Sequence, residues 1–294
     1  MEIKNVFVVG SGLMGGGIAQ VSAVAGYKVK MHDVDDERTS KGLDAIKKSL
    51  EKFVSKEKLS KEQYESAVAN ISTTTKLEDA SDADFVVEAV FESLDVKKDV
   101  FGRLDEICPP HTILGSNTSA IPITAIASVT KRRGQVLGTH FFSPVPLMRL
   151  CEIIRGLETS QETMQTAELW AQSLGKETVI IRKDHAGFIA NRLYIPMTME
   201  AVRMLEEEVA SPDHIDKAMR LGYNLPMGPL ELADMVGLDV ISGAATAIYN
   251  DIDDPKYYTP PLLKRMLAAG LLGRKTGKGF YDYSSGKQEN YWKM

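Results

Sequence analysis

Short apolar runs alternate with longer amphipathic segments up to about residue 181 of the chain. Each run is short and bounded by Gly, Asp or other polar residues, as expected of strands buried in a sheet. The runs that predict strands are residues 6–9, 28–33, 85–89, 112–115, 135–140, 150–154 and 178–181, and residues 94–107 predict a helix between two of them. This alternation is typical of a parallel sheet covered by helices.

A charged segment from about Glu37 to Ala69 interrupts this pattern. Its apolar positions recur at helical spacing and are Leu43, Ile46, Leu50, Phe53 and Leu59. The spacing predicts a helical hairpin that protrudes from the sheet domain.

The pattern changes at Asp184, and the segments beyond it are nearly all helical. Gly and Pro signals separate the predicted helices, which cover residues 189–207, 212–221, 228–235 and 260–269. We therefore expect two domains, residues 1–184 and 185–294, with the cleft between them as the default binding site.

Gly10, Gly12 and Gly15 form a G-x-G-x-x-G turn between the first strand-like run and a helical segment. Gly10 permits the tight turn, Gly12 leaves room where a pyrophosphate approaches, and Gly15 lets the helix pack closely on the sheet. Phosphates would lie at the helix N-terminus, where unpaired N–H groups and the helix dipole favour negative charge. A tight turn without a ligand can share this pattern, but the strand before it and the helix after it favour a dinucleotide site.

Asp33 ends the second strand-like run, about twenty residues after the turn, as this fingerprint requires. Its carboxylate can accept a hydrogen bond from a ribose 2′-OH and would repel a 2′-phosphate, which favours NAD over NADP as the cofactor. Taken alone, Asp33 could equally be a solvated strand end. The sequence thus predicts an α/β fold, with a Rossmann-like dinucleotide-binding domain carrying a helical hairpin insertion, followed by a smaller all-α C-terminal domain.

Composition narrows the choice of partners for this chain of 294 residues. The net charge is −5 and no basic stripe dominates, so nucleic acid is not expected as a partner. No apolar run approaches the roughly 20 residues that span a bilayer, and the N-terminus begins with strand residues, so we expect no membrane partner and a cytoplasmic location. The two cysteines and five histidines show no ligand-type spacing, so no metal site is expected.

His140 ends the apolar run at 135–140, where the carboxyl end of a strand would face the ligand crevice of an α/β sheet. Oxidising an alcohol with a nicotinamide cofactor requires a base for the hydroxyl proton, and histidine exchanges protons near neutral pH. Glu152 lies in another apolar run, where a charged side chain needs a partner, and it could orient the imidazole. The alternatives are a core histidine and a glutamate that points from an edge strand to solvent.

Two further polar clusters lie at expected domain edges. Ser119 belongs to Ser116-Asn-Thr-Ser119, which follows a strand, and its hydroxyl could reach nicotinamide and substrate. Asn191 opens a predicted helix and could donate a hydrogen bond to a substrate carbonyl. Helix caps or loop polar residues are the alternative for both clusters.

Together and in this order, these residues resemble the 3-hydroxyacyl-CoA dehydrogenase family over essentially the whole chain. The motifs that carry the resemblance are G-S-G-L-M-G-G-G-I-A at 10–19, V-V-E-A-V at 86–90, S-N-T-S at 116–119, T-H-F-F-S-P-V-P at 139–146, G-F-I-A-N-R at 187–192, P-M-G-P-L-E-L at 226–232 and G-R-K-T-G-K-G-F-Y at 273–281. Several separate motifs in the family's order are far more specific than the glycine turn alone.

The resemblance implies a catalytic pair of His140 and Glu152, with Ser119 and Asn191 at the substrate. The residues that it implies at NAD are Gly10, Ser11, Gly12, Leu13, Met14, Gly15, Asp33, Glu92, Lys97, Ser119, Ser143 and Lys275. It also places Ser49 and Lys56 of the helical hairpin at coenzyme A. Lysines of the hairpin could attract phosphates there, although the interspersed glutamates would also suit a plain solvated face.

One position departs from the family pattern. Ser143 stands in H-F-F-S-P where many members have Asn. A direct amide contact to cofactor or substrate would then be replaced by a shorter hydroxyl or by water. We expect altered positioning at this point and no loss of activity.

The implied activity is reversible NAD-dependent oxidation of an (S)-3-hydroxyacyl-CoA of fatty acid metabolism, with 3-hydroxybutyryl-CoA as the expected short-chain substrate. His140 would serve as general base and acid, and the family's usual homodimer is expected. Two alternatives remain open at this stage. One is a dehydrogenase of a free hydroxy acid or sugar acid on the same scaffold, and the other is an NAD-binding structural protein without catalysis.

Overall fold

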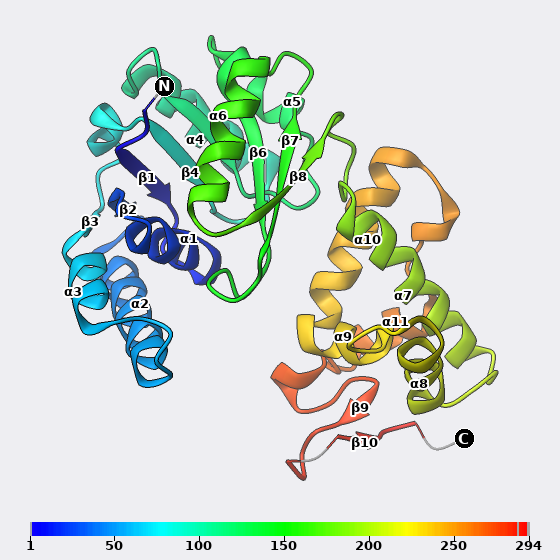
Figure 1. The fold of residues 1–294 in the computed structure, drawn as a ribbon. Helices are drawn as coiled ribbons and strands as arrows, with labels where there is room; N and C mark the ends of the chain where they lie inside the picture. The colour runs from blue at the N-terminus through cyan, green and yellow to red at the C-terminus, as the bar shows by residue number, and fades with distance from the viewer. Residues whose placement is uncertain (1, 287, 293–294) are drawn as a thin grey trace. The chain divides into compact units, whose positions relative to one another are not determined.

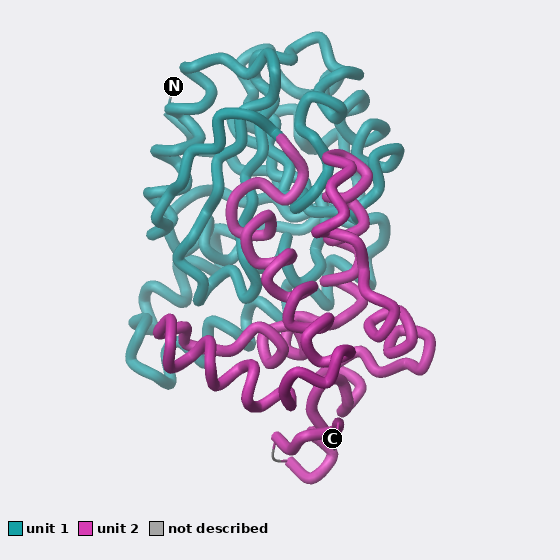
Figure 2. The backbone as a smooth tube through the Cα atoms, turned by 90° about the vertical axis from the view of Figure 1, so that its right-hand side faces the viewer, with its two compact units in different colours: residues 1–184 teal, residues 185–294 magenta. Residues whose placement is uncertain are grey.

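The computed structural model describes residues 2–286 and 288–292. The chain divides into two compact units, Met1–Asp184 and His185–Met294 (Figure 2). Each unit has its own hydrophobic core, one centred on a sheet and the other on helices.

The first unit is built on an eight-stranded sheet with the order β3-β2-β1-β4-β5-β6-β7-β8 (Figure 1). From β3 to β6 all neighbours are parallel, β7 runs antiparallel to β6, and β8 is parallel to β7. The strands are β1 (Asn5–Val9), β2 (Lys28–His32), β3 (Ile71–Thr74), β4 (Phe85–Glu88), β5 (Ile113–Ser116), β6 (Val136–Phe141), β7 (Leu150–Arg155) and β8 (Glu177–Ile181). The order 3-2-1-4-5-6 of the parallel part is that of the doubly wound dinucleotide-binding fold, so the predicted fold class is confirmed.

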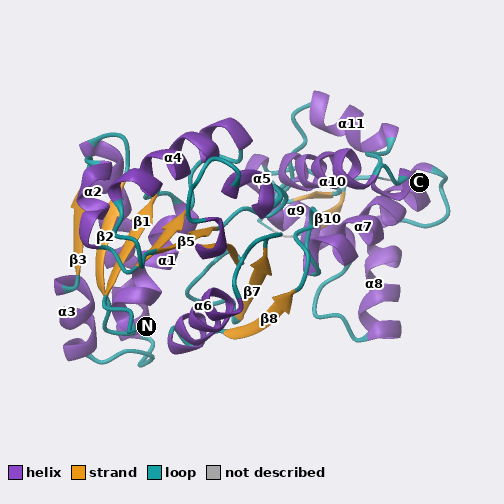
Figure 3. Cartoon of the chain, turned by 90° about the horizontal axis from the view of Figure 1, so that it is seen from above, coloured by secondary structure: helices purple, strands orange, loops and turns teal. Residues whose placement is uncertain are grey.

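Helices cover both faces of this sheet, with α4 on one side and α1 and α6 on the other (Figure 3). The α-helices of the first unit are α1 (Leu13–Val24), α2 (Asp36–Ser55), α3 (Lys61–Ala69), α4 (Leu94–Ile107), α5 (Ile123–Ala127) and α6 (Gln161–Ser173), with short 3₁₀ helices at Leu77–Asp82 and Arg133–Gln135. Trp170 of α6 stacks on Phe85 with ring centroids 4.3 Å apart and meets Phe141 edge-on at 6.0 Å. The central strands β1, β4, β5 and β6 are buried on both faces, so they read in the sequence as largely apolar runs.

The predicted helical hairpin is present as α2 and α3, which lie side by side (Figure 1). The expectation that it protrudes is wrong for part of α2, because Ile46 and Leu50 are buried in the core of the first unit. The last turns of α2 carry the more exposed lysines, including Lys52. This helix therefore serves both as a core element and as a charged surface.

The second unit is helical, and all four helices predicted there are confirmed. Its elements are α7 (Ala190–Glu206), α8 (Pro212–Tyr223), α9 (Pro229–Val236), α10 (Leu238–Ile252) and α11 (Pro261–Ala268), with 3₁₀ helices at Pro255–Tyr257 and Arg274–Thr276 and a small antiparallel pair of strands, β9 (Tyr281–Asp282) and β10 (Glu289–Asn290). The elements α5, α6, α10 and β3 were not predicted from the sequence. In α10, Gly243 and Thr246 lower the helix propensity, and β3 is a short strand with a polar sequence.

Within the described residues, no single helix has the length and apolar character needed to cross a membrane. Among the described helices, α9 and α10 are the one pair that together reach that length and composition, and they are bent by 101° relative to each other.

Candidate active site

The glycine turn at the carboxyl end of β1 has the geometry that a pyrophosphate requires. Gly10 has a φ of +104°, and a Cβ at Gly15 would lie 1.8 Å from the carbonyl oxygen of Gly10. At Gly12, in contrast, a Cβ would meet nothing within 4 Å, so the turn is open on that side. Among the described residues, no side chain caps the N-terminus of α1, which leaves its first turn able to bind an anion. These features fit the diphosphate of NAD.

Asp33 follows β2 and closes onto the glycine turn. Its Oδ2 accepts hydrogen bonds from the backbone N–H of Ser11 at 2.8 Å and from the Ser11 hydroxyl at 2.7 Å. Burial acts to raise the pKa of Asp33, but the hydrogen bonds from Ser11 and from the N–H of Val34 outweigh it and lower the pKa. The carboxylate therefore stays ionised and in place beside the turn.

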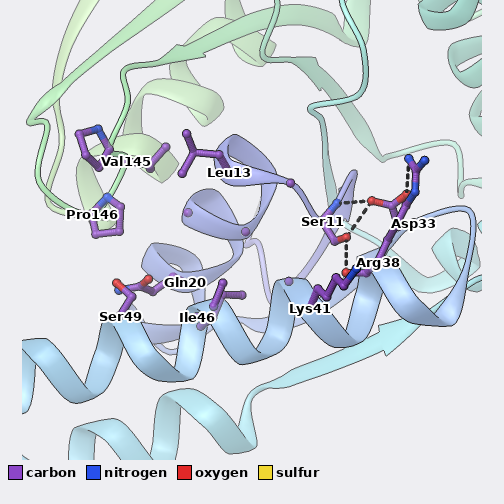
Figure 4. A pocket seen from close by; sticks show the side chains of 16 residues that line it. Ser11, Leu13, Gln20, Asp33, Arg38, Lys41, Ile46, Ser49, Val145 and Pro146 are labelled. Atoms are coloured by element: carbon purple, nitrogen blue, oxygen red, sulfur yellow. Dashed lines mark hydrogen bonds and ion pairs between the residues drawn. The ribbon is translucent and has the colours of Figure 1, made fainter. Parts of the chain in front are cut away.

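A cavity of about 630 Å³ extends from this point along α1 and α2 (Figure 4). Ser11, Asp33 and Arg38 lie at one end, and Ser49 of α2 lies toward the other, opposite Val145 and Pro146 (Figure 4). A guanidinium nitrogen of Arg38 lies 3.9 Å from Asp33. The cavity thus joins the expected ribose-binding residue to the expected coenzyme A residue Ser49.

A second cavity of about 180 Å³ shares Ser49 with the first. The residues that line it are Ser49, Lys52, Phe53, Lys56, Lys58, Pro144, Pro146 and Leu147. Both residues expected at coenzyme A, Ser49 and Lys56, therefore line one groove, whose opposite wall is the loop after Ser143. Phe53 and Pro144 supply apolar surface, and the lysines supply positive charge for phosphate groups.

His140 and Glu152 meet directly across the only antiparallel pair among the eight strands of the large sheet. They are register partners between β6 and β7, and Nδ1 of His140 lies 2.7 Å from Oε2 of Glu152. Both side chains are buried, with Glu152 only 1% exposed. The structure therefore brings the expected pair together and places Glu152 away from solvent.

Ser119 lies in a turn that is held by Glu92. Oε1 of Glu92 accepts hydrogen bonds from the Thr118 hydroxyl at 2.5 Å and from the Ser119 N–H at 3.1 Å. Lys97 is buried, and its ammonium pairs with Glu92 at 3.2 Å and with Glu88 at 2.7 Å. The structure thus joins three residues expected at NAD, but it places the ammonium of Lys97 behind the carboxylate of Glu92.

The inner part of this network was not predicted from the sequence. Glu88 ends β4 and is fully buried, and it accepts hydrogen bonds from the Ser116 hydroxyl at 2.6 Å and the Val90 N–H at 2.7 Å. Asn117 accepts a hydrogen bond from the N–H of Phe141 at 2.9 Å, which ties the ends of β5 and β6 together beside His140. The signal for Glu88 was available, because a charged residue in an apolar strand needs a partner, as was argued for Glu152.

Two of the expected residues belong to the second unit. Asn191 lies in the first turn of α7, and Lys275 pairs with Asp239 at 2.6 Å. The expected contacts of Asn191 with substrate and of Lys275 with cofactor stay predictions. No group of three or more His, Cys, Asp or Glu side chains that could hold a metal ion is found in the described part of the chain.

The doubly wound sheet and its open glycine turn define the class, which is that of the Rossmann-type NAD-binding oxidoreductases. The chain belongs to the 3-hydroxyacyl-CoA dehydrogenase family. The profile of that family's NAD binding domain matches residues 5–185, and the profile of its C-terminal domain matches residues 187–283.

Individual relatives match over nearly their whole length. A probable 3-hydroxybutyryl-CoA dehydrogenase of Bacillus subtilis is 47% identical over 283 residues, which are 96% of this chain and 98% of that protein. The 3-hydroxybutyryl-CoA dehydrogenase of Clostridioides difficile is 45% identical, over 94% of this chain and 98% of its own. A crystal structure of (S)-3-hydroxybutyryl-CoA dehydrogenase from Ralstonia eutropha superimposes with a TM-score of 0.92 at 44% identity, covering 96% of this chain and all of the other.

Proposed function

We propose that this protein catalyses the reversible NAD-dependent oxidation of (S)-3-hydroxybutyryl-CoA to acetoacetyl-CoA. The observation that carries this proposal is the buried contact between His140, near the carboxyl end of β6, and Glu152 of β7, in the same sheet that bears the glycine turn after β1. Relatives named 3-hydroxybutyryl-CoA dehydrogenase over nearly the same length support the choice of substrate.

His140 takes the proton of the C3 hydroxyl during oxidation and returns it to the keto oxygen in the reverse direction. Its Nδ1 faces Glu152, so Nε2 is the atom that exchanges this proton. Glu152 fixes the tautomer of the ring and stabilises the imidazolium that forms on proton uptake. NAD, when bound, supplies the acceptor for the C3 hydride.

Ser119 and Asn191 orient the substrate, with the amide of Asn191 donating a hydrogen bond to a carbonyl that gains charge. Glu92 supports this role of Ser119, because it holds the backbone of the 118–120 turn. Lys97 acts through Glu92, since its ammonium is buried between two carboxylates. Together these groups position the C3 carbon of the substrate for proton and hydride transfer.

The coenzyme A moiety lies in the groove between α2 and the loop that follows Ser143. Ser49 and Lys56 contact it from α2, and the neighbouring lysines attract its phosphates. Ser143 offers a hydroxyl at the position where the family usually has an amide. A free hydroxy acid would have no use for this groove.

We also propose a homodimer in the cytoplasm. The family resemblance supports the dimer, although Met199, one methionine of the second unit, is buried inside its core and is not available for an interface. Light scattering coupled to gel filtration tests the dimer, and cell fractionation tests the location.

The decisive assay follows NADH consumption with acetoacetyl-CoA, with free acetoacetate and with NADPH in place of NADH. We expect efficient turnover only with acetoacetyl-CoA and NADH. A chain-length series of 3-ketoacyl-CoA substrates then tests the preference for a short chain. No NADH consumption, or equal efficiency with free acetoacetate, would overturn the proposal.

A further inference from the structure

Lys176 is a buried cation that the proposed chemistry does not use. It lies between α6 and β8 and is only 7% exposed. Its ammonium donates hydrogen bonds to the carbonyl oxygens of Val145 at 2.5 Å and Met148 at 2.9 Å. In the described part of the chain, no ion pair with an acidic side chain is found for Lys176, and the titratable side chain that acts on its charge is that of Cys151.

Burying the charged ammonium of a lysine in this environment costs free energy. Burial lowers its pKa from the usual value, and neutral carbonyls compensate a buried charge less well than a carboxylate does. An apolar side chain of similar length would fill the same space without desolvating a charge. The function of Lys176 therefore depends on the segment to which its ammonium is hydrogen-bonded.

That segment is the loop 144–148, which both cavities share as a wall. Pro144 and Pro146 line each cavity, Val145 lines the larger and Leu147 the smaller. Figure 4 shows Val145 and Pro146 on the side of the cavity that faces Ser49, while Asp33 lies at the far end. The two carbonyls bound by Lys176 come from both ends of this wall.

The loop also packs closely against α1 at Gly17. A Cβ at Gly17 would lie 2.8 Å from Cβ of Val145, so the side chain of Val145 packs directly against the backbone of the helix. Lys176 holds the loop through two backbone carbonyls, and Gly17 of α1 limits how close the side chain of Val145 can come to the helix. The width of the groove between the loop and α2 depends on both contacts.

We infer that Lys176 is a positioning residue for the coenzyme A moiety of the substrate, because it fixes the loop 144–148 at the distance from α2 that this moiety needs. The inference rests on the proposed function, in which Ser49 and Lys56 bind coenzyme A. Lys176 itself contacts neither the substrate nor the reacting atoms.

The test replaces Lys176 by Met, which keeps the length of the side chain and removes both hydrogen bonds. Acetoacetyl-CoA is compared with the acetoacetyl thioester of N-acetylcysteamine, which has the same reacting group but lacks the nucleotide part. The KM for acetoacetyl-CoA should rise about tenfold with little change in kcat, while the KM values for the truncated thioester and for NADH stay within about twofold. Lys131→Met, at an exposed position outside the groove, is the matched control and should leave all of these values unchanged.

A second variant changes the position of the loop without altering Lys176. Gly17→Ala pushes against Val145 and should raise the KM for acetoacetyl-CoA selectively in the same way. If Lys176→Met does not fold, this variant still tests whether the position of the loop controls the binding of coenzyme A. Equal losses with both thioesters in a folded variant, or no loss with either, would overturn the inference.

The wild-type protein separates this inference from the proposed function. If wild-type enzyme does not oxidise NADH with acetoacetyl-CoA, the proposed function fails and the inference falls with it. If wild-type enzyme strongly prefers acetoacetyl-CoA to the truncated thioester but the two variants keep that preference, only the role of Lys176 is wrong.

Discussion

Two buried carboxylates, Glu88 of β4 and Glu152 of β7, contact residues that the proposed chemistry uses. Glu88 and Glu152 are at most 1% exposed, and each has a basic partner at 2.7 Å. A carboxylate in such a place is tolerated only if its partners compensate for the lost hydration. The same rule explains why both residues stand out in apolar runs of the sequence.

Replacing His140 by Gln tests the proton-transfer role at the residue scale. The amide keeps much of the volume but cannot take up the hydroxyl proton, so kcat should fall about 10²–10⁴-fold. NADH affinity, measured by fluorescence titration, should stay nearly unchanged because the glycine turn lies elsewhere on the sheet. A folded variant with near-normal turnover would refute the role of His140.

Asp33 should determine the choice between NAD and NADP. Its pKa is lowered, so the carboxylate is charged at neutral pH and repels a 2′-phosphate, while Arg38 and Lys41 line the same cavity. Asp33→Ser should therefore raise the KM for NADH and lower the KM for NADPH, each by about tenfold. Steady-state kinetics with the two cofactors measure these KM values. An unchanged KM for NADPH would argue that Arg38 and Lys41 do not reach the 2′-phosphate.

At the scale of elements, the C-terminus of α4 depends on a single arginine. The guanidinium of Arg132 donates to the carbonyl oxygens of Asp105, Cys108 and Pro109 and also pairs with the side chain of Asp105 at 2.8 Å. The last carbonyls of a helix have no partners within the helix, so a planar donor group can satisfy several of them together.

Arg132→Met should lower the free energy of unfolding by about 2–4 kcal/mol, because it leaves Oδ1 of Asp105 and these carbonyls without their donor and removes the cation beside the carboxylate. Urea unfolding followed by circular dichroism measures the change. Arg133→Met is the neighbouring control, since the side chain of Arg133 is half exposed and pairs with exposed Glu158. A loss as small as that of the control would contradict the assignment.

Most elements of this fold could be predicted because their signals are local. Apolar runs marked seven of the eight strands in the large sheet, and helical spacing marked α2, α3 and α4. The strand β3 escaped because its sequence is Ile-Ser-Thr-Thr and half of it faces away from the core. Its strand character comes from pairing with β2, which no property of the segment itself reveals.

At the scale of the whole molecule, two buried carboxylates organise the second unit. Asp216 of α8 accepts hydrogen bonds from the N–H groups of Leu230 and Glu231 at the start of α9. Asp234 of α9 accepts from the N–H groups of Phe280 and Tyr281 near the C-terminal strands. Segments far apart in the chain are thereby joined through backbone donors.

This arrangement predicts a pH dependence of stability with an unusual sign for aspartate. Burial raises the pKa of Asp234 from 3.8 to about 6. Between these values the folded protein binds more protons than the unfolded chain, so the Asp234 contribution to the free energy of unfolding falls as pH rises from about 4 to about 6.

The stability difference between wild type and Asp234→Asn isolates this contribution. As the pH rises from 4 to 7, the wild type should lose on the order of 2 kcal/mol of unfolding free energy relative to Asp234→Asn. Asp216, whose pKa is also raised mainly by burial, is present in both proteins. Parallel stability curves for the two proteins over this range would contradict the prediction.

The sequence by itself determined the features that one short segment can specify. The glycine turn is one, because the φ of Gly10 and the close approach of Gly15 exclude any side chain there. The apolar runs and helical spacings that define the fold class are others, since burial on both faces of a strand is written in consecutive residues.

Only the tertiary structure decided which residues meet. Glu152 reaches His140 because β7 runs antiparallel to β6 in a register that sets the two opposite each other. Lys176 holds a loop that lies 28 to 31 residues before it, and its environment could not be read from its neighbours in sequence. Register, burial and the partners of a buried charge depend on contacts between distant segments, so no local pattern contains them.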